Sequence, residues 1–143
     1  MASAGGHWLE LCRISPALKG FDCQFVSTTA GLVAPVGTRH VLRLPDGSRD
    51  TIGNLIASAW QFWRILRAFQ PDIVITTGAA PGAVALAVAG CAGVQVVWVE
   101  SMSSADGLSM SGRCVRHIAD LTIVQWPQLA ERDASLSYFG KIL

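Results

Sequence analysis

The sequence predicts a single α/β domain over residues 1–143, built on a Rossmann-like, doubly wound parallel sheet. Short apolar runs alternate with helical segments along the chain, the order that right-handed β–α–β crossovers produce. The run IVIT at 73–76 is continuously apolar before its threonine, as in a strand that helices cover on both faces. With 143 residues, of which 51% are hydrophobic, the chain is long enough for one well-buried core.

The elements are predicted in the following order. Strands are expected at residues 22–27, 39–44, 73–76, 95–99, 121–125 and 136–139, and helices at 8–19, 52–69, 81–92 and 110–119. Pro16 limits the first helix, Gln70-Pro71 ends the second, Gly93 stops the third and Ser109 caps the fourth. The second helix is the clearest, because its apolar residues fall on one broad arc that should face the core: Ile52, Leu55, Ile56, Ala59, Phe62, Trp63, Leu66 and Phe69.

The start of the chain departs from this pattern. A glycine loop that enters a helix normally follows a first strand, yet only four residues precede Gly5. Either the sheet lacks most of a strand or a segment lies upstream. We expect the upstream segment, so the first strand is interpreted as truncated.

Composition excludes several classes of protein. The formal charge of +1 gives no basic field for nucleic acid. The four cysteines form no CxxC pair and lie at no zinc spacing, so we expect no metal site and cysteines that are reduced and buried, as in a cytosolic protein. The long apolar stretch at 79–99 is interrupted by proline and glycine, and it is interpreted as a helix, a turn and a strand rather than a membrane span.

The first candidate site is the segment SAGGH, which includes Ser3, Gly5, Gly6 and His7. Two glycines allow a ligand to approach the backbone, and the amides of the following helix favour a phosphate or sugar hydroxyls. His7 lies where the loop meets the helix, and an imidazole there can act as a base. The alternative is a tight turn with a solvent-facing histidine. Because the GxGxxG spacing is absent, no nicotinamide cofactor is indicated.

Two further candidates follow predicted central strands, where ligands bind in open α/β sheets. Thr77 and Gly78 come after the strand at 73–76, and Glu100 and Ser101 after the strand at 95–99. Hydroxyls, helix-start amides and a carboxylate could line a polar pocket at this edge. The alternatives are simple turn chemistry at 77–78 and, for Glu100, a carboxylate that caps a helix or pairs with Arg113 or Arg116.

Two tryptophan-containing segments are also candidates. Trp126 follows a strand and precedes a proline, where it could pack internally, stack on a sugar or dock a subunit. Trp60 lies one helical turn before Arg64, with Arg67 on a flank of the same helix. This combination suits the headgroup level of a membrane, and the alternative is a core-rim tryptophan with solvated arginines.

The combination of motifs resembles the PssD/CpsF group of bacterial exopolysaccharide proteins. The motifs are SAGGH, PDIVITTGAAPG, VWVES, ADLTIVQWPQLA and YFGKIL, and together they span nearly the whole chain. The group is similar to the membrane-recruiting subunit of the eukaryotic UDP-N-acetylglucosamine transferase that acts in dolichol-linked oligosaccharide synthesis. The resemblance implies the N-terminal, acceptor-side half of a GT-B glycosyltransferase, without a cofactor of its own.

The resemblance also implies partners and roles. A separate catalytic subunit would bind the donor UDP-sugar, and this chain would bind a polyprenyl-diphosphate-linked sugar for hexosyl or N-acetylhexosaminyl transfer. Gly5, Gly6 and His7 match the loop near the acceptor diphosphate, and Glu100 matches an acid at the end of a central strand. The C-terminal segment, with Tyr138, Phe139 and Leu143, matches the part that docks the partner, and Trp126 is expected to join it.

Eukaryotic relatives carry an N-terminal membrane anchor that nothing here replaces, so membrane contact is expected to be peripheral, on the cytoplasmic face.

The resemblance leaves two alternatives in function. One alternative is a self-sufficient small Rossmann enzyme that uses a nucleotide. That enzyme would need a dinucleotide fingerprint and a Tyr-Lys pair, which the single tyrosine and the late Lys141 disfavour. The other is a scaffold whose pocket does no chemistry.

Overall fold

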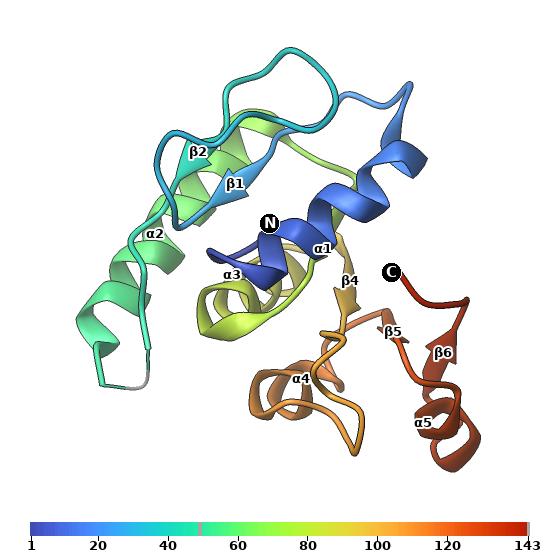
Figure 1. Cartoon of the computed structure of the whole chain (residues 1–143). Coiled ribbons are helices and arrows are strands. Elements are labelled where there is room, and N and C mark those ends of the chain that lie inside the picture. Colours follow the sequence, from blue (N-terminus) through green and yellow to red (C-terminus); the bar gives the residue numbers. More distant parts are fainter. Residues whose placement is uncertain (49, 143) are drawn as a thin grey trace.

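The computed structural model describes residues 1–48 and 50–142, and its elements alternate as the sequence predicts (Figure 1). In chain order they are α1 (Gly6–Ile14), the 3₁₀ helix η1 (Ser15–Leu18), β1 (Val26–Ser27), β2 (Leu42–Arg43), α2 (Ile52–Phe69), β3 (Ile73–Thr76), α3 (Ala79–Cys91), β4 (Gln95–Val99), α4 (Met110–Val115), β5 (Leu121–Val124), α5 (Pro127–Arg132) and β6 (Leu136–Tyr138).

All strand pairs in the described residues are parallel. Strands β3, β4, β5 and β6 form a four-stranded sheet in that order, and β1 pairs with β2. The segment Met1 to Ser3 lies between the two sheets. The Ala2 amide donates to the carbonyl of Val26 at 3.1 Å, and the Thr77 amide donates to the carbonyl of Met1 at 3.3 Å. Residues 1–3 therefore lie alongside both β1 and β3 and connect the two sheets, at the position of the first strand.

A cavity of about 520 Å³ adjoins this segment. Its walls include Met1, the residues 24–26 that lead into and begin β1, and the residues 73–75 of β3. The sequence predicts a truncated first strand, and the cavity lies beside the short segment that takes its place.

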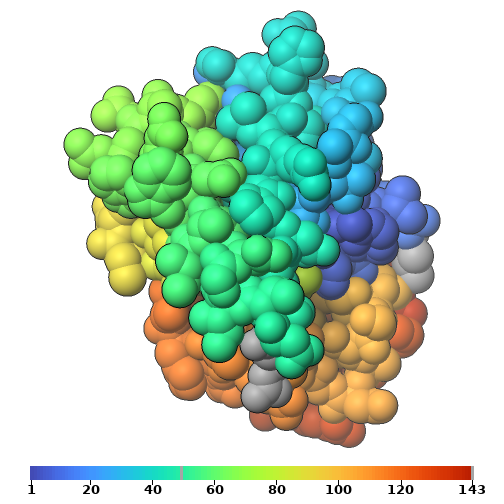
Figure 2. All heavy atoms as spheres, turned by 90° about the vertical axis from the view of Figure 1, so that its left-hand side faces the viewer, coloured from blue at the N-terminus to red at the C-terminus, as the bar shows by residue number. Residues whose placement is uncertain are grey.

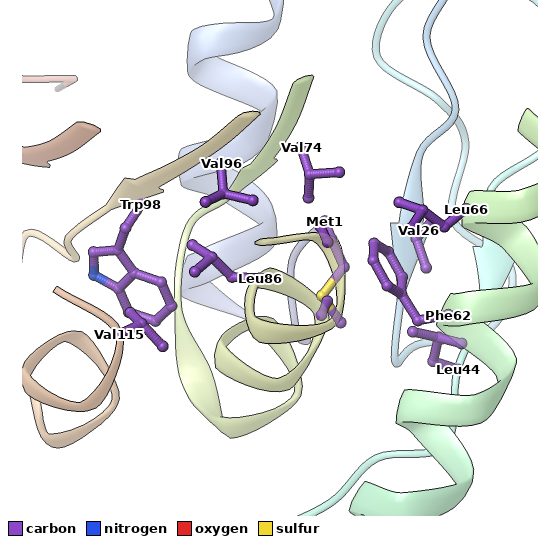
Figure 3. Packing of buried hydrophobic residues seen from close by; sticks show 12 residues of the cluster. Met1, Val26, Leu44, Phe62, Leu66, Val74, Leu86, Val96, Trp98 and Val115 are labelled. Atoms are coloured by element: carbon purple, nitrogen blue, oxygen red, sulfur yellow. The ribbon is translucent and has the colours of Figure 1, made fainter. Parts of the chain in front are cut away.

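Helices cover both faces of the sheet, as expected for a doubly wound fold. Side chains alternate along a strand, and consecutive residues here belong to different cores. Met1 joins the cluster formed with α2, α3 and α4, whereas Ala2 packs with Trp8 and Leu11 of α1. Figure 3 shows the first cluster, with Met1 between Leu86 and the α2 side chains. Helix α1 therefore lies on one face and helices α2, α3 and α4 on the opposite face.

The core-facing arc predicted for α2 is too broad. The helix bounds are confirmed, and Phe62 and Leu66 are buried. However, Ile52 is 64% exposed, Ile56 66% and Trp63 47%. Because α2 covers the outer part of the sheet and packs beside α3, only a narrow stripe meets other elements. The apolar side chains outside that stripe form an exposed apolar face.

Several other predictions need correction. Strand β1 has two residues instead of six, and η1 rather than α-helix follows Ile14. Helix α5 was not predicted, although Pro127 at its first turn is a standard helix start. The cysteines are free but less buried than predicted: Cys91, at the end of α3, and Cys114, in α4, are exposed, and the other two are half-buried at the edge of the cluster around α1.

Candidate functional site

The candidate residues gather where parallel strands end. The glycine loop follows residues 1–3, Thr77 and Gly78 follow β3, and Glu100 and Ser101 follow β4. The carboxyl ends of parallel strands meet at one edge of a sheet, where α/β proteins bind ligands. Several hydrogen bonds join these loops, and they fix the geometry of the site.

His7 and Thr77 hold each other through two hydrogen bonds. The His7 Nδ1 lies 2.7 Å from the Thr77 carbonyl oxygen, and the Thr77 hydroxyl donates to the His7 carbonyl at 2.7 Å. A carbonyl oxygen can only accept, so Nδ1 carries the proton in this contact. In the neutral ring Nε2 then keeps its lone pair, and the side chain is 28% exposed. In this tautomer, which the backbone contact fixes, Nε2 is the ring nitrogen that can accept a proton.

Gly78 makes room for the imidazole. Its φ of 127° lies in the region that favours glycine. A Cβ placed on Gly78 would lie 2.6 Å from Cε1 and 2.8 Å from Nδ1 of His7. Both the backbone conformation and the packing of the ring thus require glycine at this position.

Glu10, one turn after His7 on α1, connects the histidine to a second loop. Its Oε2 lies 3.5 Å from His7 Nδ1. Its Oε1 accepts from the Ser101 hydroxyl at 2.8 Å and from the Met102 amide at 2.9 Å. Glu10 is only 7% exposed. The sequence reasoning missed this residue, although an acid at i,i+3 from a candidate base is a detectable signal.

The pair His7 and Glu10 favours its charged forms. Glu10 raises the pKa of His7 above its ordinary value, against a lowering by burial, and the bond to Thr77 adds to the rise. Burial is the largest influence on the pKa of Glu10 and raises it. The hydrogen bonds from His7, Met102 and Ser101 together outweigh burial and leave the pKa of Glu10 below its ordinary value. The carboxylate therefore stabilises a proton on His7.

Glu100 is buried within its own loop. It is 1% exposed, and its carboxylate accepts from the Trp98 indole at 3.1 Å and from the Ser104 hydroxyl at 3.0 Å. The start of α4 packs on it, since a Cβ on Gly112 would collide with Oε2. Arg116 pairs with Asp133 instead, so the alternative of an Arg116 partner is wrong. These contacts hold the loop, and a chemical role for Glu100 stays a prediction.

The glycine loop has the geometry expected of it. Gly5 has a φ of 70° and is followed directly by α1, whose first amides lack intrahelical acceptors. Ser3, the last residue of the segment Met1 to Ser3, is 8% exposed. The loop, Thr77, Gly78 and Ser101 are therefore brought together around His7 and Glu10.

The candidate docking residues lie toward the β6 edge. The Trp126 indole donates to the Met102 carbonyl at 2.9 Å, which ties it to the loop that Glu10 holds. The ammonium of Lys141 lies 4.4 Å from the centre of the Trp126 ring. Tyr138 is half-buried on β6, while Phe139 is 74% exposed. Leu143 lies outside the described residues.

The candidate membrane residues lie on α2, outside this cluster. The Arg64 guanidinium lies 4.9 Å from the Trp60 ring centre, and the Arg67 guanidinium 5.8 Å from that of Trp63. Trp60 is 57% exposed, so it belongs to the exposed apolar face of α2 rather than to the core rim.

In residues 1–48 and 50–142, no three His, Cys, Asp or Glu side chains are grouped closely enough to hold a metal ion. Within the same residues, no helix is both long and apolar enough to cross a bilayer. The stretch at 79–99 forms α3, a turn and β4, as predicted.

Residues 44–142 match the family described as "Oligosaccharide biosynthesis protein Alg14 like". The Mus musculus protein named "UDP-N-acetylglucosamine transferase subunit ALG14" is 35% identical over 118 residues, covering 73% of this chain and 54% of the mouse protein. The Homo sapiens protein of the same name is 34% identical over 102 residues, covering 66% of this chain and 46% of the human one. The chain thus spans about half the length of these curated relatives.

Solved structures share the fold. Acinetobacter baumannii MurG superposes with a TM-score of 0.70 at 14% identity, covering 90% of this chain and 42% of MurG. This likeness confirms the predicted fold class, a parallel α/β domain of the GT-B type. The PssD/CpsF label stays a prediction, whereas the family match covers more than half of the residues. The chain belongs to the Alg14-like family of oligosaccharide biosynthesis proteins.

Proposed function

We propose that this protein is the acceptor-side subunit of a two-component UDP-N-acetylglucosamine transferase. Curated relatives are named as subunits of such an enzyme, and MurG, of which this chain matches 42%, shares the fold. The observation that carries the proposal is the pair His7 and Glu10 at the carboxyl edge of the sheet, with Nδ1 held by Thr77. The donor UDP-sugar binds to a separate catalytic subunit.

His7 is the proposed base. As the acceptor hydroxyl oxygen bonds to C1 of the donor sugar, the bond from C1 to the UDP oxygen breaks and UDP leaves with that electron pair. The hydroxyl proton passes to Nε2, and the resulting imidazolium is stabilised by the Glu10 carboxylate 3.5 Å from Nδ1. General-base catalysis of this kind contributes about 10²–10⁴ in rate.

The acceptor diphosphate binds at the glycine loop in this proposal. Backbone amides at a helix start favour an anion, and Gly5 and Gly6 let phosphate oxygens approach the backbone. The hydroxyls of Ser3 and Ser101 and the amide of Gly78 line the remaining edge. Thr77 positions His7, because its hydroxyl already donates to the His7 carbonyl.

Assembly and membrane contact use two other surfaces. Trp126, Tyr138, Phe139 and the terminal Leu143 dock the catalytic subunit at the β6 edge, where the exposed Phe139 is the natural anchor. Trp60, Arg64 and Arg67 contact the cytoplasmic face of the membrane, where the lipid-linked acceptor is presented. Contact through exposed side chains of one helix makes the association peripheral.

The proposal is tested by reconstitution. The chain and its catalytic partner are purified separately, and transfer from UDP-N-acetylglucosamine to a polyprenyl-diphosphate-linked acceptor is measured for each and for the mixture. We expect transfer only by the mixture. Robust transfer by this chain alone would favour the self-sufficient enzyme and overturn the two-component proposal.

Variants of His7 separate a working site from a scaffold. In the assembled complex, His7→Ala and His7→Gln should each lower turnover by about 10²–10⁴ without loss of assembly. Near-normal turnover with His7→Gln would leave His7 as an acceptor contact only. Unchanged turnover with both variants would identify the chain as a scaffold without chemistry of its own.

A further inference from the structure

A groove between α2 and β2 is separate from the site described above. It has a volume of about 510 Å³, and its walls come from α2, from β2 and the residues just before it, and from Gln24. Figure 2 shows the side of the molecule on which α2 lies, with the segment that contains β2 beside it. The lining residues are Gln24, Arg39, Leu42, Arg43, Trp60, Gln61, Arg64, Ile65, Ala68 and Phe69.

The groove is cationic. Three arginines line it and none of its lining residues is acidic. Arg39 is held by two hydrogen bonds to Asp22, at 2.7 and 2.8 Å, and its guanidinium lies 5.1 Å from the Phe69 ring centre. Among the described residues, neither Arg43 nor Arg64 makes an ion pair with a carboxylate. Two guanidinium groups without a carboxylate partner therefore line the groove, and guanidinium groups suit the binding of a phosphate.

The surroundings favour a phosphate attached to an apolar chain. Trp60 lines the groove and is 57% exposed, and Ile56 and Trp63, on the same exposed side of α2, are 66% and 47% exposed. Tryptophan beside arginine is typical of the level where lipid headgroups meet acyl chains. A soluble phosphate would gain nothing from these neighbours.

We propose that this groove binds the phosphate of an anionic lipid headgroup, with Arg43 and Arg64 as its charged contacts and Trp60 against the start of the acyl chains. The inference rests on the membrane contact proposed above and deepens it, since it names the ligand class and adds Arg43, which belongs to β2 rather than α2. Arg39 is part of the wall of the groove but not a charged contact, because Asp22 already balances its charge.

The experiment measures binding of the full chain to vesicles of phosphatidylcholine, with and without phosphatidylglycerol. Arg43→Gln should weaken binding to the phosphatidylglycerol vesicles about fivefold, because a basic residue near an anionic surface contributes about 1 kcal/mol. Binding to pure phosphatidylcholine should not change. Arg132→Gln removes the same charge from α5 and should leave both affinities unchanged.

The outcomes separate this inference from the wider proposal. If Arg43→Gln binds as tightly as the native chain while Trp60→Ser with Trp63→Ser binds weakly, the membrane contact stands and the headgroup groove is overturned. Unchanged binding in both variants overturns the membrane contact as well. A second arm adds inorganic phosphate without vesicles: an Arg43-dependent rise in Tm at millimolar phosphate would assign the groove to a soluble anion and overturn the lipid assignment.

Discussion

His7 and Thr77 exchange two hydrogen bonds across the gap between α1 and the end of β3, each 2.7 Å long. One bond fixes the proton on Nδ1 and the other fixes the backbone that bears the imidazole. The orientation of the proposed base is thus set by groups that are themselves held by the sheet. Substitutions at positions that contact the ring, such as Gly78, should therefore act on His7 through geometry.

The pair His7 and Glu10 should make stability depend on pH. The raised pKa of His7 contributes stability that is complete below its ordinary value of 6.5 and is lost as pH rises through the folded pKa. The lowered pKa of Glu10 contributes stability that is complete above 4.5 and is lost as pH falls through its folded pKa. Their joint contribution is therefore greatest between these two values.

Glu10→Gln tests this window. The amide keeps an acceptor for Ser101 and Met102 but removes the charge. The free energy of urea unfolding, measured from pH 4 to pH 8, should show a smaller maximum near pH 5.5 in the variant than in the native chain. Identical pH profiles for the two proteins would contradict the coupling.

Gly78→Ala should both destabilise the fold and displace His7. A side chain at a φ of 127° costs about 1–3 kcal/mol, and the Cβ would in addition lie 2.6 Å from the imidazole. Gly140→Ala is the matched control, because Gly140 has a φ of 107° but nothing within 4 Å of its Cβ position. Unfolding by urea gives the two costs, and NMR of the His7 ring should report a shift for Gly78→Ala alone. An unshifted ring in Gly78→Ala would show that the contact is relieved elsewhere.

Phe139→Asp should weaken docking of the catalytic subunit. Phe139 is 74% exposed beside β6, and a buried aromatic anchor at an interface contributes about 2 kcal/mol or more. The dissociation constant, measured by calorimetry with the purified partner, should rise at least about 30-fold. Phe21→Asp is the control, since Phe21 is 72% exposed away from that edge, and it should bind normally. Equal affinities for the two variants would place the interface elsewhere.

Residues added in front of Met1 should stabilise the fold. A strand-forming extension such as Val-Lys-Val-Val can enter the cavity between residues 24–26 and 73–75 and pair with both strands. We expect the Tm to rise by roughly 5 °C, whereas a Gly-Ser-Gly-Ser extension should give a much smaller gain.

The gain should grow as the pH falls. In a chain that starts at Met1, burial lowers the pKa of the terminal amino group from 8.0 to about 5. Between these values the unfolded chain binds more protons than the folded one, so stability decreases from pH 8 toward pH 5. A solvated amino group on the extension removes this loss. A gain that is equal at pH 6 and pH 8 would contradict the burial of the amino group.

The sequence predicted best the elements with strong local signals. The bounds of α2, β3 and β4 match the prediction, because proline, glycine and long apolar runs mark them. The exposure of Ile52, Ile56 and Trp63 was not predictable from periodicity, which shows that a helix has an apolar side but not how much of it other elements cover. Likewise, the loops around His7 were predicted individually, but the reach of Glu10 to Ser101 depends on tertiary contacts between residues 91 positions apart.

Residues 1–3 join β1 to β3 immediately ahead of the loop that bears His7, which has a consequence for the order of folding. The bond from the Met1 amino group to the Ile75 carbonyl spans 74 positions, so it forms only after distant parts of the chain have met. We therefore expect the pairing of residues 1–3 with β1 and β3 to be a late event in refolding. Because the loop that bears His7 follows residues 1–3 directly, the site should acquire its final shape in the same step. The amides of Ala2 and Thr77 should then become protected from hydrogen exchange together.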